Sequence, residues 1–462
     1  TSRLGRNPIG LAASGLLRRG PLGRMLRNPL MQRVMRNSGY LFTGSGLSAA
    51  MSMLQGILAA RLLGVQAFGV LGIITVFASV INRLTSFRMS ELVVNYVGEF
   101  SSRDEPARAA ATVKVAAAAE AISSVLAFAL IALLAPLGAR YLAKDPSIVG
   151  LFTLYGSMVL AHLVVETSTG VLQYLDEFRL LAWVQVGQGG LTLALILAAV
   201  LAKAGLNAVV WAYLVGKVAW AIAITVSAWI AARRRWGPGW WRAPLSSIFD
   251  RRREMARFAL STNLPGTLTL VTRDSEVLWL GALTSPLQVG YYKVALAILN
   301  IVLIPVQPLI STTYREVARE IATQRWENVR YLLRSGSLIA GAYSLAAAGG
   351  LAVFGVWVVS LWGSEFLPES YWALLVLLPG VIVVSVFYWN RSVLLPLGLP
   401  EYPTKVTLAA ALAKVMLIFL LVPRLGAVGM AISLGSFFFG TAALLVWKTL
   451  REIQRKAALS PA

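Results

Sequence analysis

Long apolar segments follow one another along almost the whole of this 462-residue chain. A helix that crosses the hydrocarbon core of a bilayer needs roughly 20 predominantly apolar residues. By that measure the sequence predicts twelve spanning helices, so we expect an all-α polytopic membrane protein. The predicted spans cover residues 39–62, 67–91, 109–135, 148–172, 179–203 and 207–231 in the first half of the chain, and residues 255–281, 286–313, 335–361, 371–395, 404–422 and 426–448 in the second half.

A basic connector at residues 233–254 separates the two sets of spans. It contains Arg233-Arg234-Arg235 and Arg251-Arg252-Arg253, and the only acid between these two runs is Asp250. So basic a run cannot lie in hydrocarbon, and the tryptophans beside it suit the headgroup boundary. The sequence Gly237-Pro238-Gly239 interrupts any helix through the connector. We interpret it as a cytoplasmic hinge between two membrane halves.

The distribution of basic residues predicts the orientation of the chain. The N-terminal tail, residues 1–37, contains arginines and no acid, and the C-terminal tail, residues 449–462, is also basic. Because Lys and Arg concentrate in cytoplasmic loops, we expect both tails and the connector to be cytoplasmic. They flank a first six-helix half at 38–232 and a second at 255–448. The protein is expected to be a multi-pass protein of the inner, or plasma, membrane.

Charge and composition also exclude several classes of function. The net charge is +22, but the arginines cluster in loops beside apolar segments, which indicates contact with anionic inner-leaflet lipids and no nucleic-acid binding. The chain has no cysteine and a single histidine, His162. It has no phosphate-binding loop, no nucleotide fingerprint and no metal-ligand spacing. We therefore predict no metal, no cofactor and no enzymatic activity.

The two halves repeat weakly. Arg61-Leu62-Leu63-Gly64 followed by Phe68-Gly69 in the first half matches Leu280-Gly281 followed by Val289-Gly290-Tyr291-Tyr292 in the second. Since each half has an even number of spans, both halves start on the same side of the membrane. The repeat then relates them by an axis along the membrane normal. Transporters built from such repeats bind substrate between the halves and expose it to each side in turn.

These motifs, with the turns Asp176-Glu177-Phe178-Arg179 and Gly398-Leu399-Pro400, resemble those of the polysaccharide-transport (Wzx-type) lipid-linked oligosaccharide flippases. That family belongs to the multidrug/oligosaccharidyl-lipid/polysaccharide exporter superfamily, and the resemblance covers residues 38–450. It implies a polyprenyl-pyrophosphate-linked oligosaccharide as substrate, moved from the inner to the outer leaflet for cell-surface polysaccharides such as O-antigen. It also implies a polysaccharide polymerase and glycosyltransferases as partners. The family often has an acid five positions before the glycine of span seven, where this chain has Glu276.

Ionisable residues within the spans are the candidate site, because charges at bilayer depth are costly and usually functional. A cationic cavity would hide pyrophosphate from hydrocarbon, and the planar fork of arginine suits that group. The candidate cations are Arg273, Lys217, Arg83, Lys293 and Arg391. The candidate acids, as charge partners or for ion coupling, are Glu276, Asp274, Glu166 and Glu120.

Several of these residues have a structural alternative. Arg273 and Glu276 share a helix face, so they are predicted either to form a substrate site or to lock two helices together. Arg83 can instead extend to the cytoplasmic interface. Glu120 and Glu166 are predicted either to carry protons or to pair with cations such as Lys217. His162, one turn before Glu166, is expected to be a buried histidine with its hydrogen bonds satisfied; the alternative is a proton relay with Glu166.

Three other functions compete with this hypothesis. One is a lipid flippase specific for the peptidoglycan precursor, although such proteins generally have more spans than the twelve predicted here. A drug or cation exporter of the same superfamily would need a carboxylate-rich cavity, yet the span at 39–62 contains no acid. The excess of cations in the spans favours an anionic substrate. A membrane glycosyltransferase or ligase acting on polyprenol sugars would need a large extramembrane loop, whereas the outer loops near 140–147 and 363–369 are short.

Overall fold

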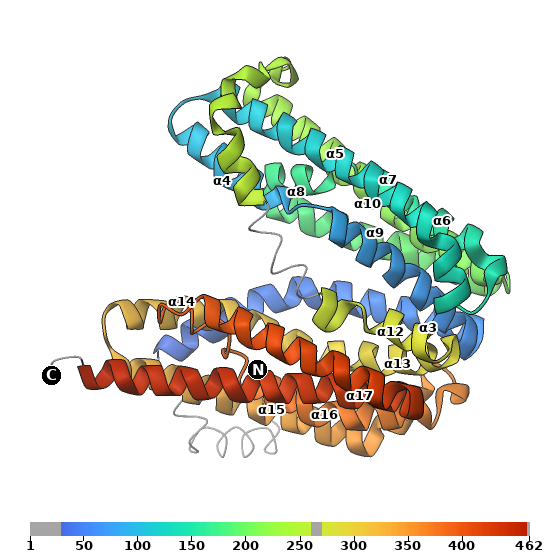
Figure 1. Ribbon diagram of the computed structural model, residues 1–462. Helices are drawn as coiled ribbons and strands as arrows, with labels where there is room; N and C mark the ends of the chain where they lie inside the picture. Colours follow the sequence, from blue (N-terminus) through green and yellow to red (C-terminus); the bar gives the residue numbers. More distant parts are fainter. Residues whose placement is uncertain (1–28, 260–269, 460–462) are drawn as a thin grey trace, which may run out of the picture.

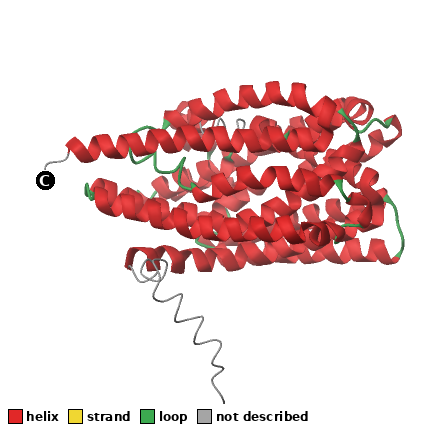
Figure 2. Cartoon of the chain, turned by 90° about the horizontal axis from the view of Figure 1, so that it is seen from below, coloured by secondary structure: helices red, strands yellow, loops and turns green. Residues whose placement is uncertain are grey.

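The computed structural model describes residues 29–259 and 270–459. Within these ranges the chain forms helices and turns and no strand. Figure 1 shows two groups of helices, here called the first and second lobes, that meet at one end and diverge toward the other. Within the bundle the helices run nearly parallel to one another (Figure 2).

The first lobe contains α3 to α10. Its helices are α3 (Pro29–Thr85), α4 (Met89–Ser102), α5 (Pro106–Leu137), α6 (Val149–Gly156), α7 (Met158–Ala161), α8 (Val165–Tyr174), α9 (Phe178–Leu201) and α10 (Leu206–Trp236). Helix α3 lies at the boundary between the lobes. Its first part contacts α9, where the Gln55 Nε2 donates to the Gly189 carbonyl at 2.8 Å, and its second part contacts α13 of the second lobe.

After residues 260–269, which lie outside the described ranges, the first described element of the second lobe is a π-helical turn at Leu270–Asp274. Its helices are α12 (Glu276–Leu283), α13 (Pro286–Leu303), α14 (Gln307–Ala322), α15 (Trp326–Ser360), α16 (Glu369–Val386) and α17 (Glu401–Leu459). The turn Ile304–Val306 separates α13 from α14, because Pro305 cannot donate a backbone hydrogen bond to the helical ladder. The span predicted at 286–313 is therefore interrupted at residues 304–306.

The number of spans agrees with the sequence. Nine helical segments in the described part of the chain are long and apolar enough to cross a membrane. Two of them contain a glycine with non-helical backbone, Gly64 (φ 72°) and Gly426 (φ 54°), where the chain reverses, so each holds two predicted spans. That makes eleven. The predicted span at 255–281 includes residues 260–269, which lie outside the described ranges.

Buried apolar residues explain the shape of the molecule. The largest buried cluster contains residues of both lobes, among them Phe68, Phe152, Tyr292 and Trp362. At the other end each lobe has a cluster of its own. The lobes thus share one core where they meet, called here the closed end, and have separate cores where they diverge.

The connector packs against the first lobe. Arg108 of α5 donates to Asp250 at 2.5 Å and to the Ser247 carbonyl at 2.7 Å. Ile248, Met255 and Ala259 are buried among first-lobe side chains. Residues 245–259 therefore pack on the first lobe, and this range includes the second part of the connector predicted at 233–254. The hydrophobic pattern alone did not distinguish packing on one lobe from packing on the other.

Candidate functional site

The two repeat glycines, Gly69 of α3 and Gly290 of α13, bring the lobes together at the closed end. A Cβ atom on Gly69 would lie 1.8 Å from the Pro286 carbonyl oxygen, and one on Gly290 would lie 2.3 Å from that of Val65. No side chain fits in either place, so the two backbones touch. The weak sequence repeat thus coincides with the contact between the lobes.

Lys293 lies one turn further along α13 from Gly290. Its ammonium group is 4.7 Å from the centre of the Phe68 ring, and its stem occupies the space left by Gly72. A cation over an aromatic face is favourable even without a carboxylate. This predicted cation therefore lies at the interface of the lobes, just inside their closest contact.

A pocket of about 510 Å³ opens on the first lobe; we call it the first-lobe pocket. It forms where two spans are interrupted, after Thr85 at the end of α3 and between α7 and α8. Interrupted helices expose backbone polar groups, which in a membrane is tolerated where the backbone lines a cavity. The pocket is lined by Ser79, Asn82, Arg83, Ser86, Phe87, Arg88, Met158, His162, Glu166 and Lys217.

The first-lobe pocket gathers three of the predicted site residues, Arg83, Lys217 and Glu166. The ammonium group of Lys217 lies 5.9 Å from the Trp220 ring centre, and no carboxylate of the described residues forms an ion pair with it. Glu166 accepts a hydrogen bond from the Ser90 hydroxyl at 2.7 Å. With Arg88 included, cations outnumber acids in the lining.

His162 differs from expectation. Its ring meets the edge of Trp220 at 5.5 Å between centres. Its Nε2 atom is buried and has no hydrogen-bond partner among the described residues, so the expected satisfied histidine is not observed. The reason is the break after α7: His162 follows the last residue of that helix and lines the pocket.

Glu120 does not line the first-lobe pocket. It is 3% exposed, and its two carboxylate oxygens accept hydrogen bonds from the backbone N–H groups of Glu166 (2.7 Å) and Thr167 (2.8 Å). These donors belong to the first turn of α8, whose free N–H groups and dipole favour an acceptor of negative charge. Glu120 therefore holds the start of α8, and with it Glu166, in place.

The three charged residues of the cluster in span seven, Arg273, Asp274 and Glu276, each have different partners. Asp274 forms an ion pair with Arg83 across the boundary between the lobes. Arg273 donates to the Asn300 side-chain oxygen at 3.0 Å. Glu276 is buried, pairs with Lys414 of α17 and accepts a hydrogen bond from the Tyr292 hydroxyl at 2.5 Å.

The pairing of Arg273 with Glu276 that the helix spacing suggested is therefore not formed. The chain changes from a π-helical turn to α12 between these residues, which alters the faces they present. Lys414, which lies in the predicted span at 404–422, is instead the buried partner of Glu276. Each of the two spans contains a charged residue, but the sequence does not show that they pair, because Glu276 and Lys414 are 138 residues apart.

Arg391 is not brought together with the other candidates. Helix α16 ends at Val386, and Arg391 lies exposed in the turns at 387–398, where the sequence predicted a continuing span to 395. It is absent from the lining of the first-lobe pocket. The apolar residues around it gave no sign that the helix stops.

This arrangement suits an anion that carries hydroxyl groups. Arg83, Arg88 and Lys217 offer charge and N–H donors, while Ser79, Asn82 and Ser86 offer donors and acceptors together. A volume of this size is typical of small-molecule sites. Binding of an anion at Arg83 would compete with Asp274 for the same guanidinium group.

Comparison with known proteins agrees with this architecture. Over 352 residues the chain is 24% identical to "Inner membrane protein YghQ" of Escherichia coli (strain K12), covering 73% of this chain and 94% of that protein. The structure is similar to an inward-facing multidrug resistance MATE family transporter of the MOP superfamily (TM-score 0.72, 16% identity, 90% of this chain and 96% of that one). It is also similar to the lipid II flippase MurJ in an inward closed conformation (TM-score 0.68, 10% identity, 91% and 90% covered).

These similarities confirm the predicted fold class, a two-lobed all-α multi-pass membrane protein. The sequence profile of a family described as "Polysaccharide biosynthesis protein" matches residues 34–314, more than half of the chain. The protein belongs to this family of polysaccharide biosynthesis proteins.

Proposed function

We propose that this protein flips a polyprenyl-pyrophosphate-linked oligosaccharide from the inner to the outer leaflet of the inner membrane by alternating access. The observation that carries the proposal is the first-lobe pocket, whose lining holds three cations, several hydroxyl and amide groups and a single acid, Glu166. Arg83 and Arg88 pair with Asp274 and Glu91 outside the lining, so Lys217 is the cation of the pocket that has no ion-pair partner among the described residues. Family membership and a fold shared with a lipid II flippase support it. In this scheme glycosyltransferases supply the glycolipid, and a polymerase consumes it after it has been flipped.

The pocket would bind the pyrophosphate and the first sugar, while the prenyl chain remains in lipid. Lys217 is the natural anchor, because it lines the pocket and forms no ion pair with a carboxylate of the described residues. Arg83 would leave Asp274 for the pyrophosphate, which breaks an ion pair between the lobes. Substrate binding and lobe movement are thereby coupled, since a ligand shifts a conformational equilibrium by its differential affinity for the two states.

The orientation in this proposal places both termini and the connector in the cytoplasm. The diverging end of the lobes then faces the cytoplasm, where the glycolipid enters, and the closed end with Gly69 and Gly290 faces outward (Figure 1). Rocking the lobes about the first-lobe pocket would open the outer side. Lys293, Arg273 and Asp274 would meet the substrate in that movement, because they lie on the facing lobe.

A flipping assay in proteoliposomes tests the substrate class. The wild-type protein is expected to move a fluorescent polyprenyl-pyrophosphate sugar and to leave the same lipid without its pyrophosphate in place. Efflux of a small organic cation, without movement of any polyprenyl-pyrophosphate substrate, would replace this proposal with the drug-exporter function.

A further inference from the structure

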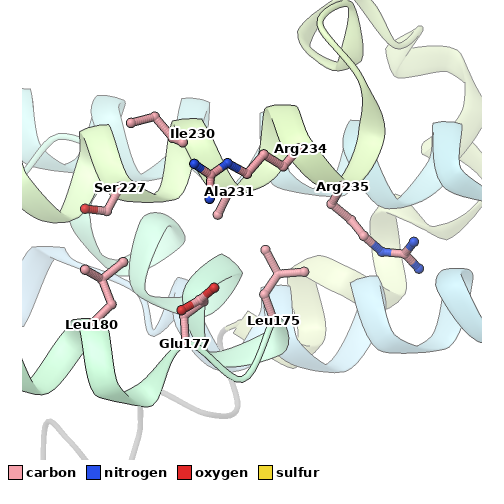
Figure 3. Close-up of a pocket in the computed structure, with 8 residues that line it drawn as sticks. All are labelled: Leu175, Glu177, Leu180, Ser227, Ile230, Ala231, Arg234 and Arg235. Carbon is pink, nitrogen blue, oxygen red and sulfur yellow. The ribbon is translucent and has the colours of Figure 1, made fainter.

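A second pocket, of about 480 Å³, lies at the end of the first lobe that carries the connector (Figure 3). The turn between α8 and α9 forms one wall, and the last turns of α10 form the other. The pocket shares no residue with the first-lobe pocket and is lined by Leu175, Glu177, Leu180, Ser227, Ile230, Ala231, Arg234 and Arg235.

Opposite charges face each other in this pocket without pairing. The Glu177 carboxylate points from its turn toward α10, and the Arg234 side chain extends over the space above it (Figure 3). Among the described residues, neither Glu177, Arg234 nor Arg235 forms an ion pair. Each is exposed, so each charge is available to a ligand.

The surroundings indicate that this ligand is a lipid. Leu180 and Ile230 line the pocket, and Ile230 is 45% exposed on the outer face of α10. Next to it, Trp229 packs on Trp240 with 5.2 Å between ring centres. Exposed tryptophans beside arginines are typical of the boundary between headgroups and hydrocarbon. An anion bound here would have apolar chains within reach of the pocket walls.

We infer that this pocket binds a phosphoethanolamine headgroup of a membrane phospholipid. Arg234 would hold the phosphate, Glu177 would accept hydrogen bonds from the ammonium group, and the acyl chains would follow Leu180 and Ile230. The Arg235 side chain points away from Arg234 (Figure 3), so it would add positive charge at the rim and no direct contact with the phosphate. Arginines alone would accept any anionic lipid. The carboxylate between the walls repels a purely anionic headgroup, and this repulsion is what gives selectivity.

Native mass spectrometry of the full-length protein in detergent tests this inference with three dioleoyl lipids that differ only in headgroup: phosphatidylethanolamine, phosphatidylcholine and phosphatidylglycerol. Phosphatidylcholine has the same headgroup charges as phosphatidylethanolamine, but its quaternary nitrogen has no N–H group and cannot donate a hydrogen bond. We expect the wild type to bind phosphatidylethanolamine roughly tenfold more tightly than the other two, as one charged hydrogen bond implies.

Variants test separately the contact of Glu177 with the ammonium group and the contact of the arginine with the phosphate. Glu177→Gln should remove the preference over phosphatidylglycerol, and Glu177→Asp should restore part of it. Arg234→Gln should weaken binding of phosphatidylethanolamine and phosphatidylglycerol alike by roughly tenfold. Arg235→Gln should weaken both less, because its side chain points away from Arg234 and Glu177 (Figure 3). The control is Arg253→Gln, an exposed arginine of the connector outside the pocket, which should bind as the wild type does.

Three results would overturn the inference. The first is equal binding of phosphatidylethanolamine and phosphatidylcholine by the wild type. The second is an unchanged ratio of phosphatidylethanolamine to phosphatidylglycerol in Glu177→Gln, which would make the carboxylate irrelevant to the ligand. The third is an equal loss in Arg253→Gln, which would reduce the pocket to part of a general basic surface.

Discussion

Glu120 shows how a charged residue inside a span can serve the fold of a site it does not line. Its carboxylate accepts two backbone hydrogen bonds at the start of α8 and so positions Glu166 at the pocket. The sequence left open whether Glu120 carries protons or pairs with a cation. The geometry favours a third role, that of a helix cap. Caps are usually Ser, Thr, Asp or Asn at the start of the same helix, whereas Glu120 caps α8 from α5.

Replacing Glu120 with Ala should lower stability by about 1–2 kcal/mol, the usual cost of a lost cap. Glu120→Gln keeps one acceptor oxygen and should lose less. Thermal unfolding in detergent measures both, with the exposed Glu401→Gln as control. Full stability in Glu120→Ala, together with loss of transport, would return Glu120 to the role of a proton carrier.

Lys414 and Glu276 form a buried ion pair in the second lobe, completed by Tyr292. Both side chains are nearly inaccessible, at 1% and 2% exposed. Removing one partner leaves an uncompensated buried charge, so Lys414→Met should destabilise the protein by about 3–5 kcal/mol. The double variant with Glu276→Gln should regain most of that loss in a denaturation experiment. Independent, additive losses would contradict a direct pair.

Among the elements, α3 and α13 define the closed end through the contact of Gly69 with Gly290. Gly69→Val should force the two backbones apart, because its Cβ has no space. Since the chain contains no cysteine, spin labels can be placed at Lys203→Cys and Ser364→Cys, in loops of the two lobes. The distance between labels should increase in Gly69→Val. In the control Gly98→Ala, whose Cβ meets open space, it should stay as in the wild type, and an unchanged distance in both would refute the glycine contact.

The connector is the second element whose contacts can be tested. Arg108 holds the pKa of Asp250 below its ordinary value of 3.8, and Arg251 lowers the pKa of Glu254 below 4.5. A lowered pKa stabilises the docked state at neutral pH, and this stabilisation is lost as pH falls through the lowered values.

Hydrogen exchange of residues 243–256, corrected for intrinsic rates, should therefore rise only below about pH 4, where acids of ordinary pKa become protonated. In Arg108→Gln the same segment should exchange faster already at pH 7, since Asp250 and the Ser247 carbonyl lose their donor. Lys405→Gln, in an exposed pair with Glu401, is the matched control. Equal exchange in wild type and Arg108→Gln would mean that apolar contacts alone dock the connector.

For the whole molecule, the sequence predicted what local hydrophobicity determines. Twelve apolar segments predicted the spans, and two copies of a short glycine motif predicted the division into two halves. Charge pairing was not predictable, because partners such as Arg83 and Asp274 are 191 residues apart and meet only when the lobes fold together. The helix breaks at the first-lobe pocket also escaped prediction, since no proline or glycine marks the residues between α7 and α8.

The most direct measurement is the rate of flipping of a polyprenyl-pyrophosphate sugar in proteoliposomes by the wild type, Lys217→Gln and the exposed loop control Lys203→Gln. If the first-lobe pocket binds pyrophosphate, Lys217→Gln should lose one charged hydrogen bond and slow flipping roughly tenfold or more, while its thermal unfolding stays unchanged. Lys203→Gln should flip as the wild type does. Wild-type flipping in a folded Lys217→Gln protein would contradict the assignment of this pocket to the substrate.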